Sequence, residues 1–369
     1  MLKRLYIDNF RCLSNFEIYP GTVSALIGPN GGGKSAVFDA LLGIQTFLGP
    51  HGSTAAEVFP PFTVTRWDSR LTQKFEIDVE LSGHLYRYSL SVQHDSEKKV
   101  ATVAEQLSAG TETLYEFDRS EVRLYGDRPS ANPRATFPSD PKRSFLPVLE
   151  ARGDNQRITA FKTWIARMWL FKLRPDRFSA DTQQEADALT TDGSNFVSWY
   201  RTLQQESPDI AARVTEDVRP VIPGLATMKM VRVGAEAKML AFDCKVDGQP
   251  FTLALPDLSD GQKVLVALYT ILRAVASQAS LLVFDEPENF IADAEIQPWL
   301  SSLRDQVVEG GRGTLIVVSH HSNVIDYLAA DEIWRIWRAG GPTRLERLDV
   351  DRSQGLSASE WVRLNGADG

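Results

Sequence analysis

Apolar stretches typical of strands open the chain and return near its end. Residues 3–10 (KRLYIDNF) alternate between polar and apolar side chains, and residues 23–27 (VSALI) form an apolar run interrupted only by Ser24, as in a strand buried on both faces of a sheet. After a glycine-rich segment, Val37, Leu41 and Phe47 are spaced along one face of a helix. The first 48 residues therefore predict a strand, a loop and a helix.

The middle of the chain predicts antiparallel strands and two helices. Residues 75–81 and 84–92 alternate on either side of Ser82-Gly83, which predicts a hairpin, and residues 113–126 extend it. Five prolines between residues 127 and 147 predict a loop or linker. Helices are expected over 155–173 and 196–205, and strands within 225–255.

The last third alternates between helix and strand. There is no internal repeat and no heptad seam long enough for a coiled coil. Such an alternation is typical of an α/β protein. Helices are expected over 260–278, 294–309 and 322–329, and strands over 281–284, 314–318 and 332–338.

Composition limits the classes of protein that remain. The 369 residues carry 40 Lys and Arg against 48 Asp and Glu, a formal charge of -8, so any DNA contact must be a local patch. Only Cys12 and Cys244 are present, which excludes a disulfide framework and a cysteine-based zinc cluster. No apolar run approaches the roughly 20 residues of a membrane span, and the N-terminus lacks the apolar core of a signal peptide. We therefore expect a cytoplasmic protein with no membrane partner.

The glycine-rich segment fits the pattern G-x-x-x-x-G-K-[ST] of a phosphate-binding loop, between a predicted strand and helix. In such a loop, backbone N–H groups surround a polyphosphate and the helix N-terminus adds positive potential. Lys34 would reach the β- and γ-phosphates of ATP, and the Ser35 hydroxyl would ligate Mg²⁺. The expected nucleotide contacts are Gly28, Pro29, Asn30, Gly31, Gly32, Gly33, Lys34, Ser35 and Ala36.

Two carboxylates follow the apolar stretch 281–284. A buried strand there places Asp285 and Glu286 at the carboxyl edge of the sheet, where nucleotide sites lie. We expect Asp285 to hold Mg²⁺ through water and Glu286 to polarise the attacking water as general base. A solvated acidic turn is the alternative, and the phosphate-binding loop disfavours it.

The segment 258–262 (LSDGQ) opens a predicted helix and by itself is a helix cap. Because it lies between the two nucleotide motifs, it resembles the L-S-G-G-Q signature of the ATP-binding cassette ATPases, with Asp260 in place of the first glycine. The resemblance implies that this segment meets the γ-phosphate of a nucleotide held by another protomer. The residues concerned are Ser259, Asp260, Gly261 and Gln262.

Other positions carry the same resemblance. In cassette ATPases a histidine after the strand corresponding to 314–318 contacts the γ-phosphate; His320 is the first choice here and His321 the second. The opening L-x-I-x-N-F-R-C resembles that of RecF, SMC and OLD-type ATPases, which implies that Arg11 approaches the nucleotide, with a surface arginine as the alternative.

Two positions depart from the cassette pattern. The aspartate expected seven residues after the first acid of the strand is Ala292 here, with Asp293 one residue later, which leaves communication between protomers in doubt. The glutamine that senses Mg²⁺ in the family is assigned to Gln156, at the start of the predicted helix 155–173.

Taken together, the motifs resemble those of bacterial AAA-family ATPases with a RecF/OLD-like cassette head, without a coiled coil or a TOPRIM nuclease domain. This implies an α/β P-loop NTPase of the ABC type (RecF/SMC head), with an antiparallel β subdomain and a helical lobe inserted between phosphate loop and signature. The expected parts are residues 1–125 with the phosphate loop, 126–255 as linker and insertion, 256–350 with signature, carboxylates and histidines, and 351–369 as a tail.

The resemblance implies an Mg²⁺-dependent ATPase that closes as a head-to-tail homodimer, or higher oligomer, around ATP and opens on hydrolysis. Relatives act on DNA, so the expected role is bacterial defence against phage or plasmids with a separate effector, a nuclease or toxin. A DNA-repair or genome-maintenance ATPase and a nucleotide-gated scaffold for an effector stay open. The N-F-R-C opening disfavours a transporter motor, and a kinase would leave LSDGQ unexplained.

Overall fold

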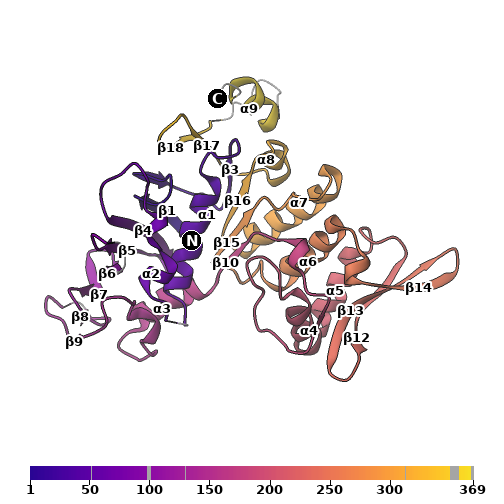
Figure 1. The fold of residues 1–369 in the computed structure, drawn as a ribbon, viewed down its shortest axis with the longest axis horizontal. Coiled ribbons are helices and arrows are strands. Elements are labelled where there is room, and N and C mark those ends of the chain that lie inside the picture. The colour runs from indigo at the N-terminus through magenta and orange to yellow at the C-terminus, as the bar shows by residue number, and fades with distance from the viewer. Residues whose placement is uncertain (51, 98–100, 129, 312, 350–356, 367–369) are drawn as a thin grey trace.

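A central, mostly parallel sheet lies between two further layers (Figure 1). The computed structural model describes residues 1–50, 52–97, 101–128, 130–311, 313–349 and 357–366. In the central sheet, of order β10–β15–β16–β3–β17–β18, the first five strands are parallel and β18 is antiparallel. Strands from both ends of the chain thus pair in one sheet. Its strands are β3 (Val23–Ile27), β10 (Met168–Phe171), β15 (Leu281–Asp285), β16 (Thr314–Ser319), β17 (Glu332–Arg338) and β18 (Thr343–Arg347).

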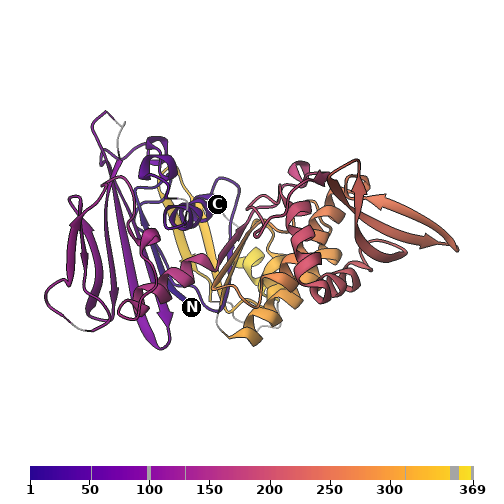
Figure 2. The same cartoon turned by 90° about the horizontal axis from the view of Figure 1, so that it is seen from below.

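Side chains of the central strands alternate between two hydrophobic cores. Val23 and Leu282 point into a core shared with α6 (Asp260–Ala274), α7 (Asp293–Gly310) and α8 (Asn323–Leu328). Leu26 and Val283 point into the other core, which contains α1 (Lys34–Phe47) and the second large sheet (Figure 2). This burial on both faces explains why residues 23–27 are apolar apart from Ser24.

The second sheet is antiparallel, eight-stranded and of order β2–β1–β4–β5–β6–β7–β8–β9. The hairpin at Ser82-Gly83 forms as predicted between β4 and β5. Residues 127–147, expected to be a loop or linker, contain the additional strand β9, which pairs with β8. Its strands are β1 (Leu2–Asp8), β2 (Phe16–Ile18), β4 (Thr72–Leu81), β5 (His84–His94), β6 (Ala101–Ala109), β7 (Glu112–Asp118), β8 (Glu121–Leu124) and β9 (Ala135–Pro138).

The prediction of a helix over residues 155–173 is wrong in its second half. The helix α3 (Gln156–Ala166) ends at Ala166, and the following residues form β10, in which Met168 pairs with Leu281 and Phe171 with Phe284. An apolar run of four residues fits a helix or a strand equally, and pairing with β15 decides between them. Because β9 joins the first sheet and α3 packs into its core, we propose ending the first lobe after α3 rather than at residue 125.

A buried carboxylate ties the sheet to the loop before α3. Glu105 on β6 accepts hydrogen bonds from the hydroxyls of Tyr88 (2.8 Å), Tyr115 (3.2 Å) and Ser144 (2.7 Å). Burial raises the pKa of Glu105 to about 7, and these three hydrogen bonds oppose the shift. The loop is therefore attached to the sheet by a group whose charge changes near neutral pH.

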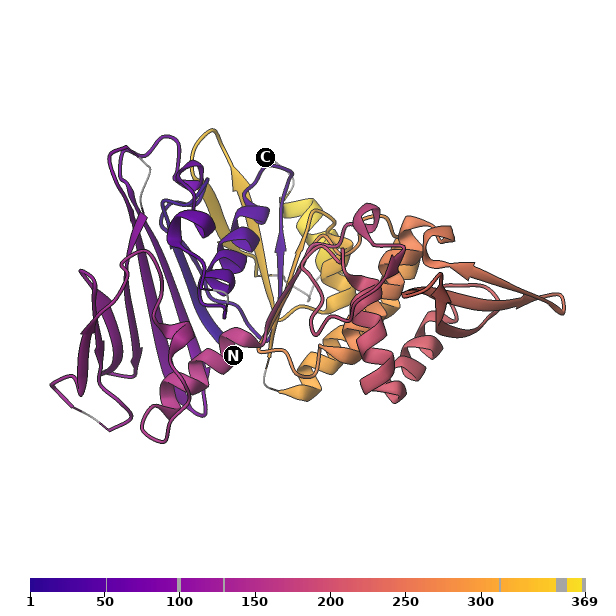
Figure 3. The same ribbon diagram turned by 60° about the horizontal axis from the view of Figure 1, so that its bottom comes forward.

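The other side of the molecule carries the helical lobe and a β arm (Figures 1 and 3). The predicted helix near 196–205 is confirmed as α4 (Phe196–Glu206), and Pro208 starts a further helix, α5 (Pro208–Val218), that the pattern did not predict. The arm contains β12 (Leu225–Val233), β13 (Ala237–Val246) and β14 (Gln249–Ala254), within the predicted strand region; β11 (Asp181–Thr182) also pairs with β13.

Two short elements complete the described part of the chain. The helix α2 (Ala55–Val58) follows α1, and α9 (Ala358–Gly366) lies within the predicted tail, whose residues 351–356 and 367–369 are outside the described residues. Among the helices that the structure describes, none is both long and apolar enough to span a bilayer.

Candidate nucleotide site

Three central strands end at one edge of the sheet with the predicted nucleotide residues. β3 leads into the phosphate loop at Gly28, and β15 ends at Asp285. Between them lies β16, which ends at Ser319, opposite Ile27, one residue before His320. The fold therefore brings the loop, the carboxylates and the histidines together from three distant parts of the sequence.

Glycines of the phosphate loop are required by close packing against the C-terminal strands. A Cβ atom at Gly28 would lie 1.9 Å from the backbone oxygen of Ile336 on β17. Gly33, the N-cap of α1, has φ 111°, and a Cβ there would lie 2.3 Å from the hydroxyl oxygen of Thr343 on β18. Larger residues at these positions would push the loop away from the sheet edge.

Lys34 is folded back on its own loop. Its side chain is 5% exposed, and Nζ donates to the backbone oxygens of Gly28 (2.8 Å) and Pro29 (3.1 Å). Burial lowers the pKa of Lys34, and the nearby charge of Glu286, 4.0 Å away, opposes that shift. The ammonium group is thus held over the loop, where phosphate oxygens would replace the two carbonyl acceptors.

Asp285 and Ser35 form the predicted metal-ligand pair. The Ser35 hydroxyl donates to Asp285 Oδ2 (3.2 Å), and Lys172 Nζ, beside β10, lies 2.5 Å from the same oxygen. Asp285 is buried, and its other oxygen, Oδ1, has no hydrogen-bond partner. A hydroxyl and a carboxylate with an unused buried oxygen fit Mg²⁺, which prefers oxygen ligands.

Lys172 was not predicted as a site residue. It directly follows the stretch 168–171, which the sequence analysis assigned to a helix. If residues 168–171 had been predicted as a strand parallel to β15, Lys172 would have been placed next to Asp285.

Glu286 is oriented by two side chains beyond the end of β15. Its backbone is left-handed (φ 54°), Asn289 Nδ2 donates to Oε2 (2.9 Å), and His320 Nδ1 lies 3.2 Å from Oε1. Burial would raise the pKa of Glu286, but the Asn289 hydrogen bond and the charges of His320 and Lys34 outweigh it and lower the pKa. An ionised carboxylate held beside the phosphate loop suits a group that polarises water.

His321 stands next to His320 at the same edge. The two rings have centroids 4.0 Å apart, and the His321 backbone N–H donates to the Ser319 hydroxyl (2.9 Å). The Ser319 hydroxyl in turn donates to Glu288, a buried carboxylate that the sequence analysis did not single out. Both predicted histidines therefore lie at the site, and His320 is the one bonded to Glu286.

A cavity of about 690 Å³ opens beside the phosphate loop. Asn30, Lys34 and Ala36 line it on the loop side. Trp67, half exposed, also lines it, with the Arg338 guanidinium 5.2 Å from its ring centroid. Further lining residues are Arg11, Cys12, Gly31, Gly33, Ser35, Phe62, Val64, Arg66 and Glu286.

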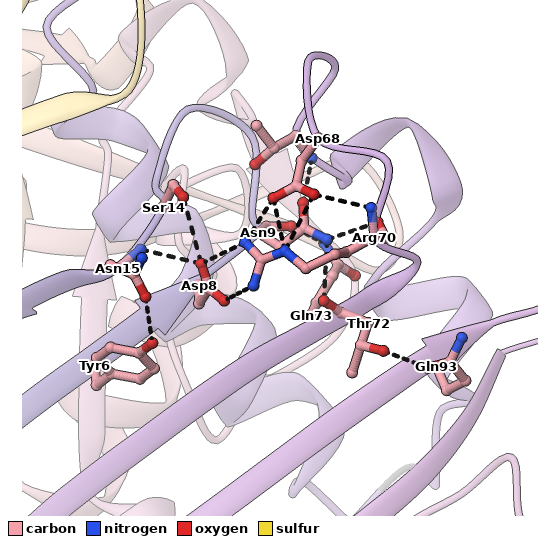
Figure 4. Close-up of polar contacts among 11 residues, drawn as sticks. Tyr6, Asp8, Asn9, Ser14, Asn15, Asp68, Arg70, Thr72, Gln73 and Gln93 are labelled. Carbon is pink, nitrogen blue, oxygen red and sulfur yellow. Dashed lines mark hydrogen bonds and ion pairs between the residues drawn. The ribbon is translucent and has the colours of Figure 1, made fainter.

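The loop that carries Trp67 is fastened to β1 by a polar cluster (Figure 4). Arg70 donates to both oxygens of the buried Asp8 (2.6 and 3.2 Å) and also binds Asp68. Asn9 Nδ2 donates to the backbone oxygens of Arg70 (2.8 Å) and Thr72 (3.0 Å). The aromatic wall of the cavity is thereby fixed to the sheet; no sequence motif signalled it.

Arg11, which the resemblance expects near the nucleotide, lines the cavity. Its backbone is left-handed (φ 53°), and its guanidinium forms an ion pair with Asp39 on α1. The side chain is 44% exposed, and this ion pair holds it against α1 at the edge of the cavity.

The signature segment is away from this cavity. Ser259 caps α6: its hydroxyl accepts from Gln262 N–H (3.3 Å), and Gln262 Oε1 accepts from Ser259 N–H (3.1 Å). A Cβ at Gly261 would lie 2.6 Å from the backbone oxygen of Phe290, so the segment packs against the loop after β15. Ser259 and Asp260 are exposed, and none of the four signature residues lines the cavity. The helix-cap interpretation thus holds within the chain, and the exposed face stays free for another molecule.

The two positions that depart from the cassette pattern, Ala292 and Gln156, lie at the starts of helices. Ala292 precedes α7, and Asp293 in the first turn of α7 accepts a hydrogen bond from Asn323 (2.8 Å), within the chain. Gln156 starts α3, is exposed, and binds Asp127 through its backbone N–H (2.6 Å). The structure does not bring Gln156 to Asp285; Lys172 occupies that place.

Fold and site define a P-loop ATPase of the ABC/AAA type with an SMC/OLD-like head. The chain belongs to the family described as “AAA domain, putative AbiEii toxin, Type IV TA system”, whose model matches residues 23–326. The expected family resemblance and fold class are thereby confirmed.

Comparison with known proteins agrees with this assignment. An OLD nuclease of Thermus scotoductus is 46% identical over 41 residues, 11% of this chain and 8% of the relative. The zinc import ATP-binding protein ZnuC of Haemophilus influenzae is 32% identical over 94 residues, 26% of this chain and 32% of the relative. The chain thus matches less than a third of each relative's length.

Solved SMC heads share the fold over nearly the whole chain. The head domain from Pyrococcus yayanosii superposes with a TM-score of 0.59 at 10% identity, covering 96% of this chain and 98% of that one. An SMC head bound to the C-winged helix domain of ScpA gives 0.56 at 14% identity, covering 95% and 99%.

Proposed function

We propose that this protein binds Mg²⁺·ATP in the cavity beside the phosphate loop and hydrolyses it. The observation that carries the proposal is the convergence of Lys34, Asp285 and Glu286 at one sheet edge, with a buried Asp285 oxygen unused. Ser35 and Asp285 would hold the metal ion, which would neutralise charge on the phosphates. The half-exposed Trp67 offers a face on which the base can stack.

In the hydrolytic step, Glu286 accepts the proton of the water that attacks the γ-phosphorus, and the bond to the β-phosphate oxygen breaks. Asn289 and His320 keep the carboxylate in place. Lys34, released from the two loop carbonyls, stabilises the charge that develops on the phosphate oxygens.

We also propose a head-to-tail dimer in which each signature completes the partner's site. Ser259 and the N-terminus of α6 are exposed and do not line the cavity of their own chain. In a dimer they can contact the nucleotide that the partner binds. Phe290, 58% exposed and packed beside Gly261, supplies an apolar contact on the same face. Asp260 adds a negative charge there, which Lys263 partly balances (3.2 Å).

Replacing the proposed base tests the chemistry. Glu286→Gln keeps the shape but removes the proton acceptor, so ATP binding should persist while the turnover rate falls at least a hundredfold. Phosphate release and ATP titration measure the two effects, with Glu309→Gln at the exposed end of α7 as a matched control. Normal phosphate release by Glu286→Gln would remove this residue as the base.

Ser259→Arg tests the composite site. A bulky cation at the α6 terminus should block the partner's γ-phosphate and abolish turnover, while each monomer still binds ATP, because Ser259 does not line its own cavity. Sedimentation of the Glu286→Gln variant with and without Ser259→Arg shows whether ATP-dependent dimers form. Turnover that survives Ser259→Arg means that the site is complete within one chain.

For the cellular role, we propose nucleotide-gated defence against phage or plasmids together with a separate effector. Similarity to an OLD nuclease and the toxin–antitoxin wording of the family description support it. The SMC head bound to a ScpA domain favours a scaffold that holds a protein partner as the second candidate. Phage and plasmid challenge of cells with and without Lys34→Ala tests the defence role, and a repair defect without a defence defect would favour genome maintenance.

A further inference from the structure

Three side chains that can bind metal gather behind the proposed base. Glu288 comes from the loop after β15, and His320 and His321 follow β16. One carboxylate oxygen of Glu288 and one ring nitrogen of each histidine all lie within 4.8 Å of one another. Two neighbouring strand ends therefore present three ligand atoms to one point.

Glu288 is not satisfied by the protein around it. Its side chain is buried, with the whole residue 5% exposed, and Oε1 accepts a hydrogen bond from the Ser319 hydroxyl. The other oxygen, Oε2, is buried without a hydrogen-bond partner. Burying a carboxylate oxygen without a donor is costly, so the arrangement calls for a cation that completes it.

The ligand types indicate which cation fits. Two imidazoles and one carboxylate are borderline ligands that suit Zn²⁺ and related transition ions, whereas Mg²⁺ prefers oxygen alone. Bonds of about 2.1 Å place two ligands of one zinc ion about 3–4 Å apart. Starting from separations within 4.8 Å, exposed histidine rings need to move by only about 1 Å, and a fourth position stays open to water.

Glu286 prepares His320 for this role. An ionised carboxylate only accepts, so the hydrogen in the contact between Glu286 Oε1 and His320 Nδ1 (3.2 Å) is on the imidazole. This contact leaves Nε2 as the ring nitrogen of His320 that can bind a metal ion, and a carboxylate behind a ligating histidine is the usual support of such a ligand.

We propose that Glu288, His320 and His321 bind a Zn²⁺-class ion at a site separate from the Mg²⁺ site at Ser35 and Asp285. A metal ion on Nε2 of His320 prevents this nitrogen from carrying a hydrogen and donating it to the γ-phosphate, so an occupied site holds the ATPase in a state that does not turn over. The metal-binding part stands on its own geometry, while the inhibition rests on the proposed ATPase function.

Titration of the nucleotide-free full chain with Zn²⁺ tests the binding. We expect one Zn²⁺ per chain by calorimetry, and a Co²⁺ absorption band of a nitrogen-liganded ion, with millimolar Mg²⁺ unable to displace either. Glu288→Gln and His321→Ala should each weaken binding at least about tenfold. His84→Ala, which removes an exposed histidine at the start of β5, is the control and should bind as the parent does.

Two results would overturn the site: binding that is unchanged in both ligand variants, or Zn²⁺ that millimolar Mg²⁺ displaces. His321→Ala removes an exposed side chain, so its folding is secure even if the buried Glu288 position does not tolerate change. An ATPase assay with added Zn²⁺ then tests inhibition separately, and relief in His321→Ala supports it. If Zn²⁺ binds but the protein has no ATPase, only the proposed function fails.

Discussion

Lys172 lies next to Asp285, at the place where the proposed Mg²⁺ would bind. Its ammonium group lies 2.5 Å from Asp285 Oδ2 and 3.4 Å from the Ser35 hydroxyl, so one cation already bridges both predicted Mg²⁺ ligands. Binding of Mg²⁺ would require Lys172 to break its ion pair with Asp285. The lysine side chain is flexible and 41% exposed, so it can turn away. We therefore predict that Lys172→Met lowers the Tm of the metal-free protein and increases the rise in Tm that Mg²⁺ causes.

The size of the effect follows from burial. At 2.5 Å and an effective dielectric constant of about 20, the gross attraction is about 7 kcal/mol. Because Lys172 is 41% exposed while Asp285 is almost fully buried, solvent screens most of this, and losing the lysine should cost roughly 2 kcal/mol. For a chain of 369 residues that corresponds to a decrease of about 3 °C in Tm.

Thermal unfolding of both proteins with and without Mg²⁺, and no nucleotide, measures the prediction. Lys245→Met is the matched control, because it removes the same charge from an exposed position on β13. Mg²⁺ should raise the Tm of Lys172→Met by more than that of the parent, since the carboxylate has lost its competing cation. If Lys172→Met and Lys245→Met unfold alike and gain equally from Mg²⁺, Lys172 does not compete with the metal ion for Asp285.

Two further predictions concern the base wall and the buried carboxylate. Trp67→Ala should weaken ATP binding by roughly tenfold, as expected for losing one stacked base, but leave tripolyphosphate binding unchanged; equal loss for both ligands would contradict stacking. The pKa of Glu105 rises from 4.5 to about 7 on folding, so the folded state binds the proton more tightly and stability falls as pH rises from about 4.5 to 7. That loss is roughly 3 kcal/mol, and urea unfolding of Glu105→Gln at pH 5 and 8 should lack it; an unchanged pH dependence would rule out Glu105 as the source.

The parts of the site that could be predicted are those whose chemistry is written in consecutive residues. A phosphate loop needs its glycines next to Lys34, and β15 needs its buried run next to Asp285, so both were visible in the sequence. The central strands β3, β15 and β16 were visible for the same reason, because burial on both faces leaves a nearly continuous apolar run.

The parts that were missed depend on contacts between distant segments. Pairing with β15 decides whether residues 168–171 form a helix or a strand. Because they were predicted as a helix, Lys172 was missed as a site residue and Gln156 was chosen instead. Trp67 belongs to a loop without a motif, and it reaches the cavity only because Arg70 and Asp8 fasten that loop to β1. Such placement is a tertiary property that local pattern does not carry.

The nucleotide cavity and the signature segment lie in different places of the chain's structure. In the described part of the chain, the residues of the phosphate loop that we propose to hold the phosphates line the cavity, while Ser259 at the N-terminus of α6 is exposed and does not line it. The link between them is the loop after β15, since Glu286 and Glu288 face the strand ends and Phe290 packs beside Gly261. A change at Glu286 or His320 on nucleotide binding can therefore reach the exposed signature through five residues of backbone. Coupling of ATP to assembly would then need no movement of the sheet, only of this loop.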